Sequence, residues 1–274
     1  MDIKVTIVMP CFNSARHIAS AIRSVQKQTF PFFELLIVDG GSNDASKEII
    51  YNIMKKDHRV RFIENKHDQG PAHARSVGIQ QARGYYIAFL DADDLWLPEK
   101  LERQVSFMRS TGAKFSFTRY RKIADSGQVL SCLMPMLKKY TFEDALRYRG
   151  IGTLTVMIEK KLLTNDIIST WRKFGGEDYV WWLFILHKGE IAYLLDEDLA
   201  RYRVSKNSLT SKYQFYTIRS IFILYKKYLK LPLDKALFNY TCYLINTSLQ
   251  KIYVIIMSRL KIKRDKSNSI KESI

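Results

Sequence analysis

Short apolar, β-prone runs alternate with helical repeats along the first hundred residues. The runs at residues 3–9, 33–38, 60–63 and 85–90 predict buried strands. Apolar positions between them recur at helical intervals, and we expect Ser14 to cap the first helix. Strands joined by crossover helices of this length pair in parallel. We therefore predict an α/β fold with a mainly parallel sheet flanked by helices.

The second hundred residues continue this pattern less regularly. We expect helices over residues 72–82 and 101–108, after Thr141 and after residue 176, and strands at residues 114–120, 154–158, 191–195 and 199–204. Trp181 and Trp182 follow one another in the last of these helices, where adjacent side chains point about 100° apart. At most one of the two can therefore face a ligand, and we assign the other to the core.

The end of the chain differs in composition from the rest. Residues 201–274 contain 16 Lys or Arg and three Asp or Glu, which is +13 of the net charge of +17. Apolar residues recur there at helical spacing, but the longest apolar run, residues 252–257, is far shorter than the ~20 residues that span a bilayer. We predict one domain over residues 1–208 and a basic amphipathic helical tail over residues 209–274.

Three carboxylates follow the strand predicted at residues 85–90, namely Asp91, Asp93 and Asp94. Ligands of open α/β sheets bind at the carboxyl ends of strands. Crowded carboxylates repel one another, so a hard divalent cation such as Mg²⁺ or Mn²⁺, with phosphates completing its shell, fits this cluster. The alternative is a solvated loop that caps the helix after Pro98.

Two further carboxylates lie at the ends of predicted elements. Asp39 leaves a strand into a pair of glycines, which let a flat base approach the backbone while the carboxylate accepts from its N–H. Asp178 follows Glu177 at the start of an apolar helix, where the helix dipole favours the ionised form. The alternatives are a turn-forming role for Asp39 and ordinary helix capping for Asp178.

In this order and spacing, the motifs resemble those of the family 2 glycosyltransferases, the inverting, metal-dependent group with the GT-A fold. The resemblance covers roughly residues 3–205. It rests on Pro10-Cys11-Phe12-Asn13, Asp39-Gly40-Gly41-Ser42-Asn43-Asp44, Ala74-Arg75-Ser76, Asp91-Ala92-Asp93-Asp94 and Glu177-Asp178. It implies a GT-A domain, here followed by the basic helical tail.

The resemblance also implies how a donor would bind. Asp39 and the turn from Pro10 to Asn13 would hold the uracil of a UDP-sugar. Arg75 would contact the diphosphate or the metal-binding aspartates. Two positions depart from the family pattern, because Gly40 replaces the usual second aspartate and Ser76 replaces the usual asparagine after the arginine.

The remaining roles concern the metal and the chemistry. By the same resemblance, Asp93 binds Mn²⁺ or Mg²⁺, with Asp91 near the ribose and the metal. Asp178 matches the catalytic base. Arg203 and Lys206 are candidates for a loop contact to the donor diphosphate.

These roles predict an inverting hexosyltransferase, which moves a hexose or N-acetylhexosamine from a UDP-sugar to an acceptor hydroxyl. We expect the acceptor to be a polyprenyl diphosphate-linked saccharide, as in bacterial O-antigen or capsule assembly. A polymerising synthase is disfavoured, since neither a Gln-x-x-Arg-Trp motif nor a transmembrane span is found. A nucleotidylyltransferase would need a glycine-rich phosphate loop after the first strand, which the segment from Pro10 to Asn13 does not provide.

The basic tail leaves three partners open: an anionic membrane surface, nucleic acid, or the domain itself. Basic amphipathic helices without a span are typical of membrane-surface docking. Nucleic acid is disfavoured, because the basic residues alternate with aliphatic ones and the carboxylate cluster would have no purpose. The first residues run directly into a strand pattern without a signal peptide, so we expect a cytoplasmic protein held peripherally at the inner face of the cell membrane.

Overall fold

The computed structural model describes residues 4–65, 70–130, 133, 136–170, 177–204 and 220–271. Its first half repeats a strand and a helix, as the apolar pattern predicts. The elements are β1 (Val5–Cys11), α1 (Ile18–Gln26), β2 (Phe33–Asp39), α2 (Ser46–Met54), β3 (Val60–Glu64), α3 (Pro71–Gln81) and β4 (Tyr86–Phe89). Strands β2 and β4 both pair in parallel with β1, and β3 pairs in parallel with β2.

The second half completes the sheet with mixed pairing. Its elements are β5 (Leu95–Trp96), α4 (Lys100–Thr111), β6 (Phe115–Ile123), β7 (Lys139–Tyr140), α5 (Phe142–Arg147), η1 (Thr153–Thr155), β8 (Met157–Glu159), η2 (Lys160–Leu162), α6 (Asn165–Ile168), α7 (Glu177–His187) and β9 (Ala192–Arg203). The described strands follow the order β3-β2-β1-β4-β8-β6-β9-β5, with β7 on β9. The predicted α/β architecture with a mostly parallel sheet is confirmed.

Four local predictions were wrong. The first strand, expected at residues 3–9 and to be broken by Pro10, continues to Cys11, and Pro10 pairs with Val38 of β2. Ser14 does not cap α1, because a turn intervenes and the helix begins only at Ile18. The two strands expected at residues 191–204 form the single strand β9, and the strand expected at residues 154–158 begins as the 3₁₀ turn η1.

The sheet divides the core in two because strand side chains alternate between its faces. Val8 and Phe89 belong to the cluster on one face, which α3 and α7 cover, and Ile7 and Ala88 belong to the cluster on the other, with α1 and α4. Trp181 and Trp182 are both buried in the first cluster, against Phe89. Neither tryptophan therefore offers a face to a ligand.

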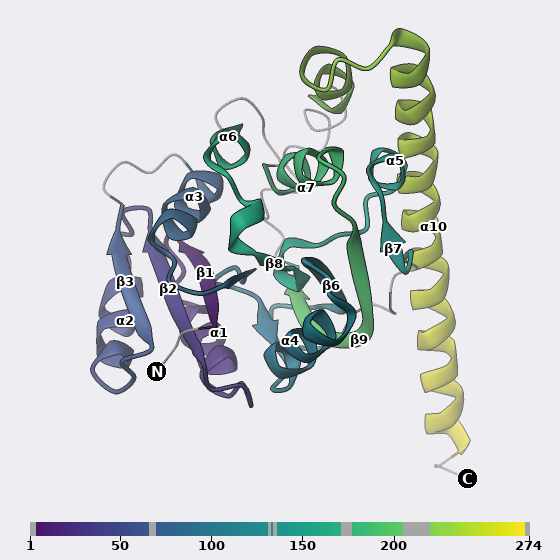
Figure 1. The fold of residues 1–274 in the computed structure, drawn as a ribbon. Coiled ribbons are helices and arrows are strands. Elements are labelled where there is room, and N and C mark those ends of the chain that lie inside the picture. Colours follow the sequence, from purple (N-terminus) through teal and green to yellow (C-terminus); the bar gives the residue numbers. More distant parts are fainter. Residues whose placement is uncertain are drawn as a thin grey trace.

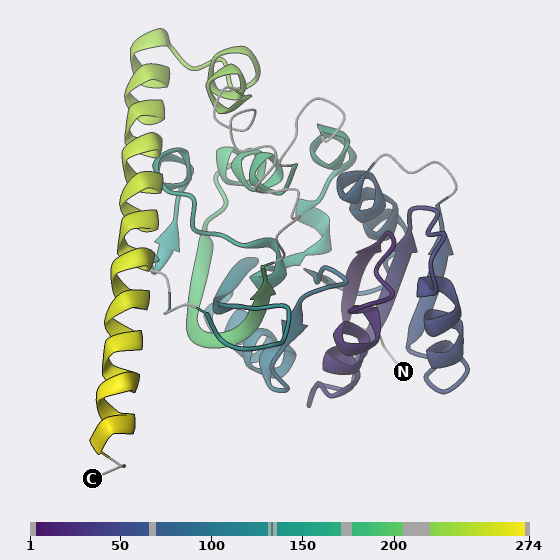
Figure 2. The same cartoon turned by 180° about the vertical axis from the view of Figure 1, so that it is seen from behind.

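The C-terminal segment contains the π-helical turn η4 (Leu224–Tyr228) and the long helix α10 (Leu233–Lys271). In Figures 1 and 2, α10 runs along the side of the molecule that carries α5 and β7, opposite the side with β3 and α2. Tyr225, Ala236 and Tyr243 are buried in the same core cluster as Trp181. The helical prediction for the tail is confirmed over these residues. The predicted boundary at residues 208/209 lies outside the described residues.

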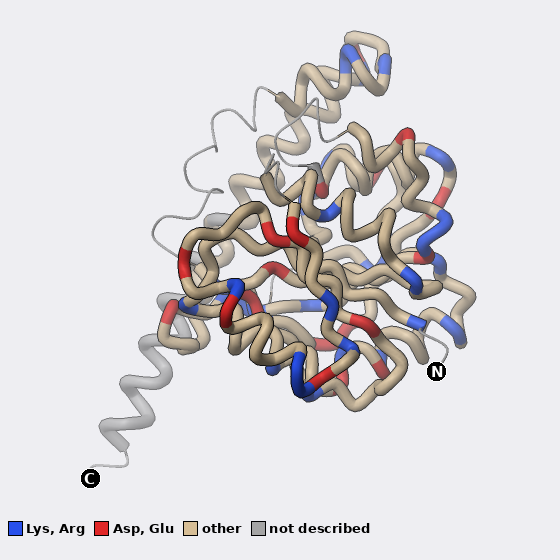
Figure 3. Tube along the Cα trace, turned by 90° about the vertical axis from the view of Figure 1, so that its left-hand side faces the viewer, with Lys and Arg blue, Asp and Glu red and all other residues tan. Residues whose placement is uncertain are grey.

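No helix in the described part of the chain is both long enough and apolar enough to cross a membrane. Outside the tail, acidic and basic positions are interspersed along the trace, as Figure 3 shows. The excess of positive charge is therefore a property of the C-terminal segment, where +13 of the net +17 resides.

Candidate active site

The carboxylates after β4 form a tight, partly buried turn. The Asp94 backbone N–H donates to the Asp91 carbonyl at 3.1 Å, so all three side chains stay within one turn of chain. Burial, and then the charge of Asp91, raises the pKa of Asp93 to about 6. Burial, followed by the charges of Asp91 and Asp93, raises the pKa of Asp94 well above its usual range. These carboxylates therefore repel one another in the absence of a cation.

A divalent cation fits this turn. Burial and then repulsion by Asp91 raise the pKa of Asp93, and a cation would relieve this repulsion. Carboxylate oxygens are the ligands that Mg²⁺ and Mn²⁺ prefer. Asp94 Oδ2 is buried and has no hydrogen-bond partner among the described residues. No set of three His, Cys, Asp or Glu within those residues is placed to hold a metal ion by itself. A metal held here would therefore take further ligands from a bound phosphate.

Helix α3 places a buried cation against the turn. Arg75 is only 5% exposed, and its guanidinium donates to Asp91 Oδ1 at 2.5 Å. The helix lies close to β1 because Gly78 has no side chain, and a Cβ there would come within 2.4 Å of Val8. Arg75 thus neutralises Asp91 and leaves Asp93 as the less compensated carboxylate of the pair.

Arg203, at the end of β9, fixes the turn from the other side. Its backbone N–H donates to Asp94 Oδ1 at 2.8 Å and its Nε to the Asp93 carbonyl at 2.7 Å. One terminal nitrogen, Nη1, donates to the carbonyls of Ala124 and Asp125. The side chain is 6% exposed. This geometry positions the carboxylate turn, whereas the predicted diphosphate contact stays a prediction. Lys206 lies outside the described residues.

The loops after β1 and β2 hold each other in place. Asp39 Oδ2 accepts from the backbone N–H groups of Gly41 and Ser42, and Oδ1 accepts from the Ser42 hydroxyl at 2.5 Å. Asn13 adopts a left-handed conformation with φ 47°, which asparagine tolerates, and its Oδ1 accepts from Asn43 N–H at 3.0 Å. Asp39 is fully buried, so its carboxylate shapes this turn.

Pro10 and Asn13 border the same pair of loops. Pro10 is half-buried in β1 beside Val38, and Asn13 is exposed. The Asn13 backbone N–H donates to the hydroxyl of Ser42 at 2.9 Å. Sequence analysis missed Ser42, although a serine three residues after a strand-end aspartate is a common turn signal. The uracil contact of these residues stays a prediction.

Asp178 lies at the first turn of α7 and is oriented by Thr153. The Thr153 hydroxyl donates to Asp178 Oδ2 at 2.5 Å, and the Tyr179 N–H donates to Oδ1 at 2.7 Å. Thr153 belongs to η1, and the indole of Trp96, two residues after the carboxylate turn, donates to the Leu154 carbonyl at 2.8 Å. A short hydrogen-bonded path therefore connects the carboxylate turn with Asp178. Sequence analysis missed Thr153, since nothing local in its segment marks it.

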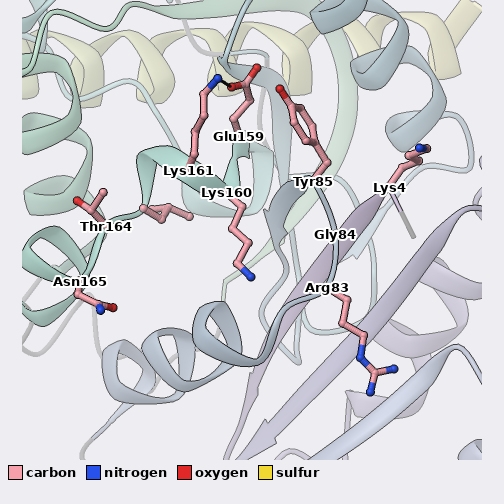
Figure 4. A pocket seen from close by; sticks show the side chains of 10 residues that line it. Lys4, Arg83, Gly84, Tyr85, Glu159, Lys160, Lys161, Thr164 and Asn165 are labelled. Atoms are coloured by element: carbon pink, nitrogen blue, oxygen red, sulfur yellow. Dashed lines mark ion pairs between the residues drawn. The ribbon is translucent and has the colours of Figure 1, made fainter. Parts of the chain in front are cut away.

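A separate open pocket of about 920 Å³ lies at the other end of β4. Figure 4 shows Lys160, Lys161, Tyr85 and Arg83 around it. Lys160 donates to the Ala82 carbonyl at 2.6 Å, and Lys161 pairs with Glu159 at 2.6 Å. Because it borders the beginning of β4, this pocket is not part of the site formed around Asp91 and Asp93.

Comparisons with known proteins show the family to which this chain belongs. The model of the family described as "Glycosyl transferase family 2" matches residues 6–150. The chain is 33% identical over 242 residues to the putative teichuronic acid biosynthesis glycosyltransferase TuaG of Bacillus subtilis (strain 168), covering 88% of this chain and 95% of that protein. It is 34% identical over 211 residues to the Escherichia coli UDP-Glc:alpha-D-GlcNAc-diphosphoundecaprenol beta-1,3-glucosyltransferase WfgD, covering 77% of this chain and 81% of that protein.

Solved structures of low identity share the fold. The crystal structure of S. aureus TarS 1-349 in complex with UDP-GlcNAc superimposes with a TM-score of 0.67 at 18% identity, covering 88% of this chain and 71% of that one. The mannosyltransferase PcManGT from Pyrobaculum calidifontis, in complex with GDP-Man and Mn²⁺, gives 0.65 at 14% identity, covering 97% and 80%. The predicted GT-A fold is confirmed.

Proposed function

Because this chain belongs to glycosyl transferase family 2, and is therefore a glycosyltransferase, we propose that it is an inverting, metal-dependent hexosyltransferase. Its donor is a UDP-sugar carrying a hexose or an N-acetylhexosamine. Its acceptor is a saccharide linked to a polyprenyl diphosphate, in the synthesis of a surface polysaccharide. Two Escherichia coli relatives, WfgD and WfaP, are named for glucosyl transfer from UDP-Glc to a diphosphoundecaprenol-linked GlcNAc.

The observation that carries this proposal is the connection between two kinds of carboxylate. Asp91 and Asp93 lie at the end of β4, and Asp178 lies at the start of α7. The turn η1 joins them, because Trp96 donates to its Leu154 carbonyl and its Thr153 hydroxyl donates to Asp178. A transferase that inverts needs these two functions side by side, one to bind the leaving diphosphate and one to accept a proton from the attacking hydroxyl.

Each residue then has a definite task. Asp93, with Asp91, would hold Mn²⁺ or Mg²⁺, which when bound neutralises charge on the leaving diphosphate. Asp178 accepts the proton of the acceptor hydroxyl at Oδ1 or Oδ2, while Thr153 keeps the carboxylate oriented toward the acceptor. Pro10, Asn13 and Asp39 border the uracil.

The test is transfer by the intact protein. We expect UDP-glucose or UDP-N-acetylglucosamine, with a short-chain α-N-acetylglucosaminyl-diphosphoprenol, to give a β-linked product with Mn²⁺ or Mg²⁺ and none with a chelator. In Asp93→Ala, transfer should fall by roughly 10³-fold and UDP binding should lose its dependence on Mn²⁺. The exposed Asp166→Ala on α6 is the control. An α-linked product, or full activity with chelator, would contradict the proposal.

We also propose that the tail places the enzyme on an anionic membrane surface, at the inner face of the cell membrane. Four apolar side chains of α10, spaced four, three and four residues apart, form an exposed outer row: Ile245, Leu249, Ile252 and Ile256. Each is more than half exposed. Lys and Arg of the same segment supply attraction to anionic lipid, on the order of 1 kcal/mol per charge. We keep the prediction that nucleic acid is not a partner.

A further inference from the structure

Arg149 is an exposed cation in the segment that leads from α5 to η1. It follows the end of α5 by two residues and precedes Thr153, the residue that orients Asp178, by four. None of the ion pairs formed among the described residues includes it. Sequence analysis did not single it out, because a lone arginine in an irregular segment carries no pattern.

Helix α10 holds this segment in place. Arg147 Nε donates to Asn239 Oδ1 at 2.7 Å, and Asn246 Nδ2 donates to the Arg147 carbonyl at 3.1 Å. Tyr243, which is 2% exposed, lies between Asn239 and Asn246 along α10, on the turn of the helix that faces this segment, and it is one of the groups that raise the pKa of Arg149. The family model ends at residue 150, so the element that positions Arg149 lies outside the segment that defines the family.

The tyrosine beside Asp178 completes this support. The rings of Tyr179 and Tyr243 lie 5.9 Å apart, and the Tyr179 hydroxyl donates to the Ala145 carbonyl at 2.9 Å. The same hydroxyl lies 2.9 Å from that of Tyr225. The start of α7, the end of α5 and the C-terminal segment are therefore one hydrogen-bonded unit.

Arg149 also lies within electrostatic reach of both parts of the site. Desolvation by neighbouring protein atoms lowers the pKa of the Arg149 guanidinium. Tyr243, Asp178 and Tyr179 outweigh this effect, so the pKa of Arg149 is raised above its ordinary value. Burial raises the pKa of Tyr120 to about 12, and the charges of Arg149 and Asp94 both act on this hydroxyl. Arg149 thus lies close to the Thr153–Asp178 contact along the chain, and its charge acts on groups at both Asp178 and Tyr120.

We propose that Arg149 binds a phosphate of the acceptor's diphosphate group, and that Tyr243 is its positioning residue. This rests on the proposed function. In a sugar linked to a diphosphate, one ring separates the reacting hydroxyl from the phosphates, so an acceptor whose hydroxyl lies at Asp178 brings a phosphate to a neighbouring cation. A guanidinium suits this ligand because its planar fork binds two phosphate oxygens at once. The donor diphosphate would have its own partner in a metal held by Asp93.

The test compares an acceptor that carries the diphosphate group with one that lacks it. One is a short-chain α-N-acetylglucosaminyl-diphosphoprenol, and the other is octyl N-acetylglucosaminide, which has no phosphate. In Arg149→Gln, kcat/KM for the diphosphate acceptor should fall roughly 10- to 100-fold, while kcat/KM for the neutral glycoside should change less than about twofold. Arg109→Gln, an exposed arginine on α4, is the control and should change neither.

Two further variants separate binding from folding. Arg149→Lys keeps the charge but loses the fork, so it should retain part of the preference for the diphosphate acceptor. Tyr243→Phe keeps the buried ring and removes the hydroxyl, and it should lower the same preference by a smaller factor. An equal loss on both acceptors, or a weaker Kd for the UDP-sugar in Arg149→Gln, would overturn the proposal.

Direct binding keeps the inference separate from the proposed function. Calorimetry of the diphosphate acceptor without donor should show weaker binding to Arg149→Gln than to the parent protein. If the parent transfers no sugar, the proposed function fails, and this titration still decides the role of Arg149. Equal affinities for parent and variant would overturn it.

Discussion

The donor side of the site, formed by the loops after β1, β2 and β4, differs in construction from the acceptor side, formed by residues 145–153, the start of α7 and α10. On the donor side, parallel neighbouring strands deliver their loops to one edge of the sheet, and Asn13 and Ser42 tie two loops through backbone contacts. On the acceptor side, the Thr153 hydroxyl donates to Asp178, and Arg147 donates to Asn239, which lies 92 residues away. The first side is built by the sheet and the second by long-range packing.

Asp178→Asn should have the largest effect, and it should change the acceptor side without changing the donor side. The amide keeps the size and accepts the Thr153 hydroxyl at its oxygen, but it cannot take up a proton. We expect kcat to fall by roughly 10²- to 10⁴-fold while the Kd for the UDP-sugar holds. Asp166→Asn serves as the control. Weaker binding of the UDP-sugar would show that the two sides do not act independently. An unchanged kcat would mean that another residue is the base.

The same difference explains what could be predicted from the sequence. Strands β1, β2 and β4 have contiguous apolar runs, and the carboxylates follow at their ends, so the fold and the donor-side candidates Asp39, Asp91 and Asp93 come from local pattern. Thr153 acquires its role only when η1 packs under Trp96.

The roles of other residues depend on partners that sequence spacing does not indicate. Arg203 resembles a donor-binding loop residue in sequence, yet its side chain donates hydrogen bonds to the carbonyls of Asp93, Ala124 and Asp125. β9 appears as two short strands in the sequence because the acidic residues Asp196, Glu197 and Asp198 interrupt its apolar pattern. Two of these pair with arginines of β6, which the sequence does not reveal.

Substitutions in the outer row of α10 test whether the acceptor side also binds the membrane surface. Leu249→Gln combined with Ile252→Gln should lower affinity for anionic vesicles roughly 10- to 100-fold, because two exposed apolar side chains no longer enter the lipid. The melting temperature should hold, since the inner face with Ala236 and Tyr243 is untouched. Raising the salt should release the parent protein as well.

The control for the outer row is Tyr51→Gln on α2, an exposed apolar residue on the other side of the molecule. Sedimentation with vesicles at two salt concentrations measures the effect. Vesicle binding that ignores both the substitutions and the salt would exclude the docking proposal. Removing residues 212–274 is a poorer test, because it would also expose the core around Tyr225 and Tyr243.

Arg203→Met tests the contact that β9 makes with the donor side. Methionine leaves the carbonyls of Asp93 and Asp125 without their side-chain donor, while the Ala124 carbonyl keeps the Gly127 N–H. We therefore expect a melting temperature lower by roughly 5–10 °C and a kcat/KM lower by about tenfold. Arg103→Met, an exposed arginine paired with Glu197, is the control. A raised KM for the UDP-sugar with an unchanged melting temperature would instead favour the predicted diphosphate contact.

Lys100 lies between the donor side and the acceptor side, and its substitution should have the smallest effect on stability. It is fully buried, with Nζ 4.0 Å above the Trp96 ring and donating to Gln104 at 2.8 Å, and Gln104 in turn donates to the Thr155 carbonyl of η1. Burial lowers the pKa of Lys100 well below its ordinary value. The unfolded chain, with an ordinary lysine pKa near 10.4, therefore binds one more proton than the folded protein between the two pKa values.

Stability should therefore rise with pH through that window in the parent protein and gain nothing further above about 10.4. Lys100→Met has a similar length and no charge, so it should remove this slope and change the melting temperature at neutral pH by only a few degrees, upward if the lost desolvation outweighs the lost ring contact. Denaturant unfolding at several pH values between 7 and 10 measures the slope, with the exposed Lys27→Met as the control. If the slope persists in Lys100→Met, the Lys100 amine is not its source, and the prediction that Lys100 loses its proton in the folded protein is wrong.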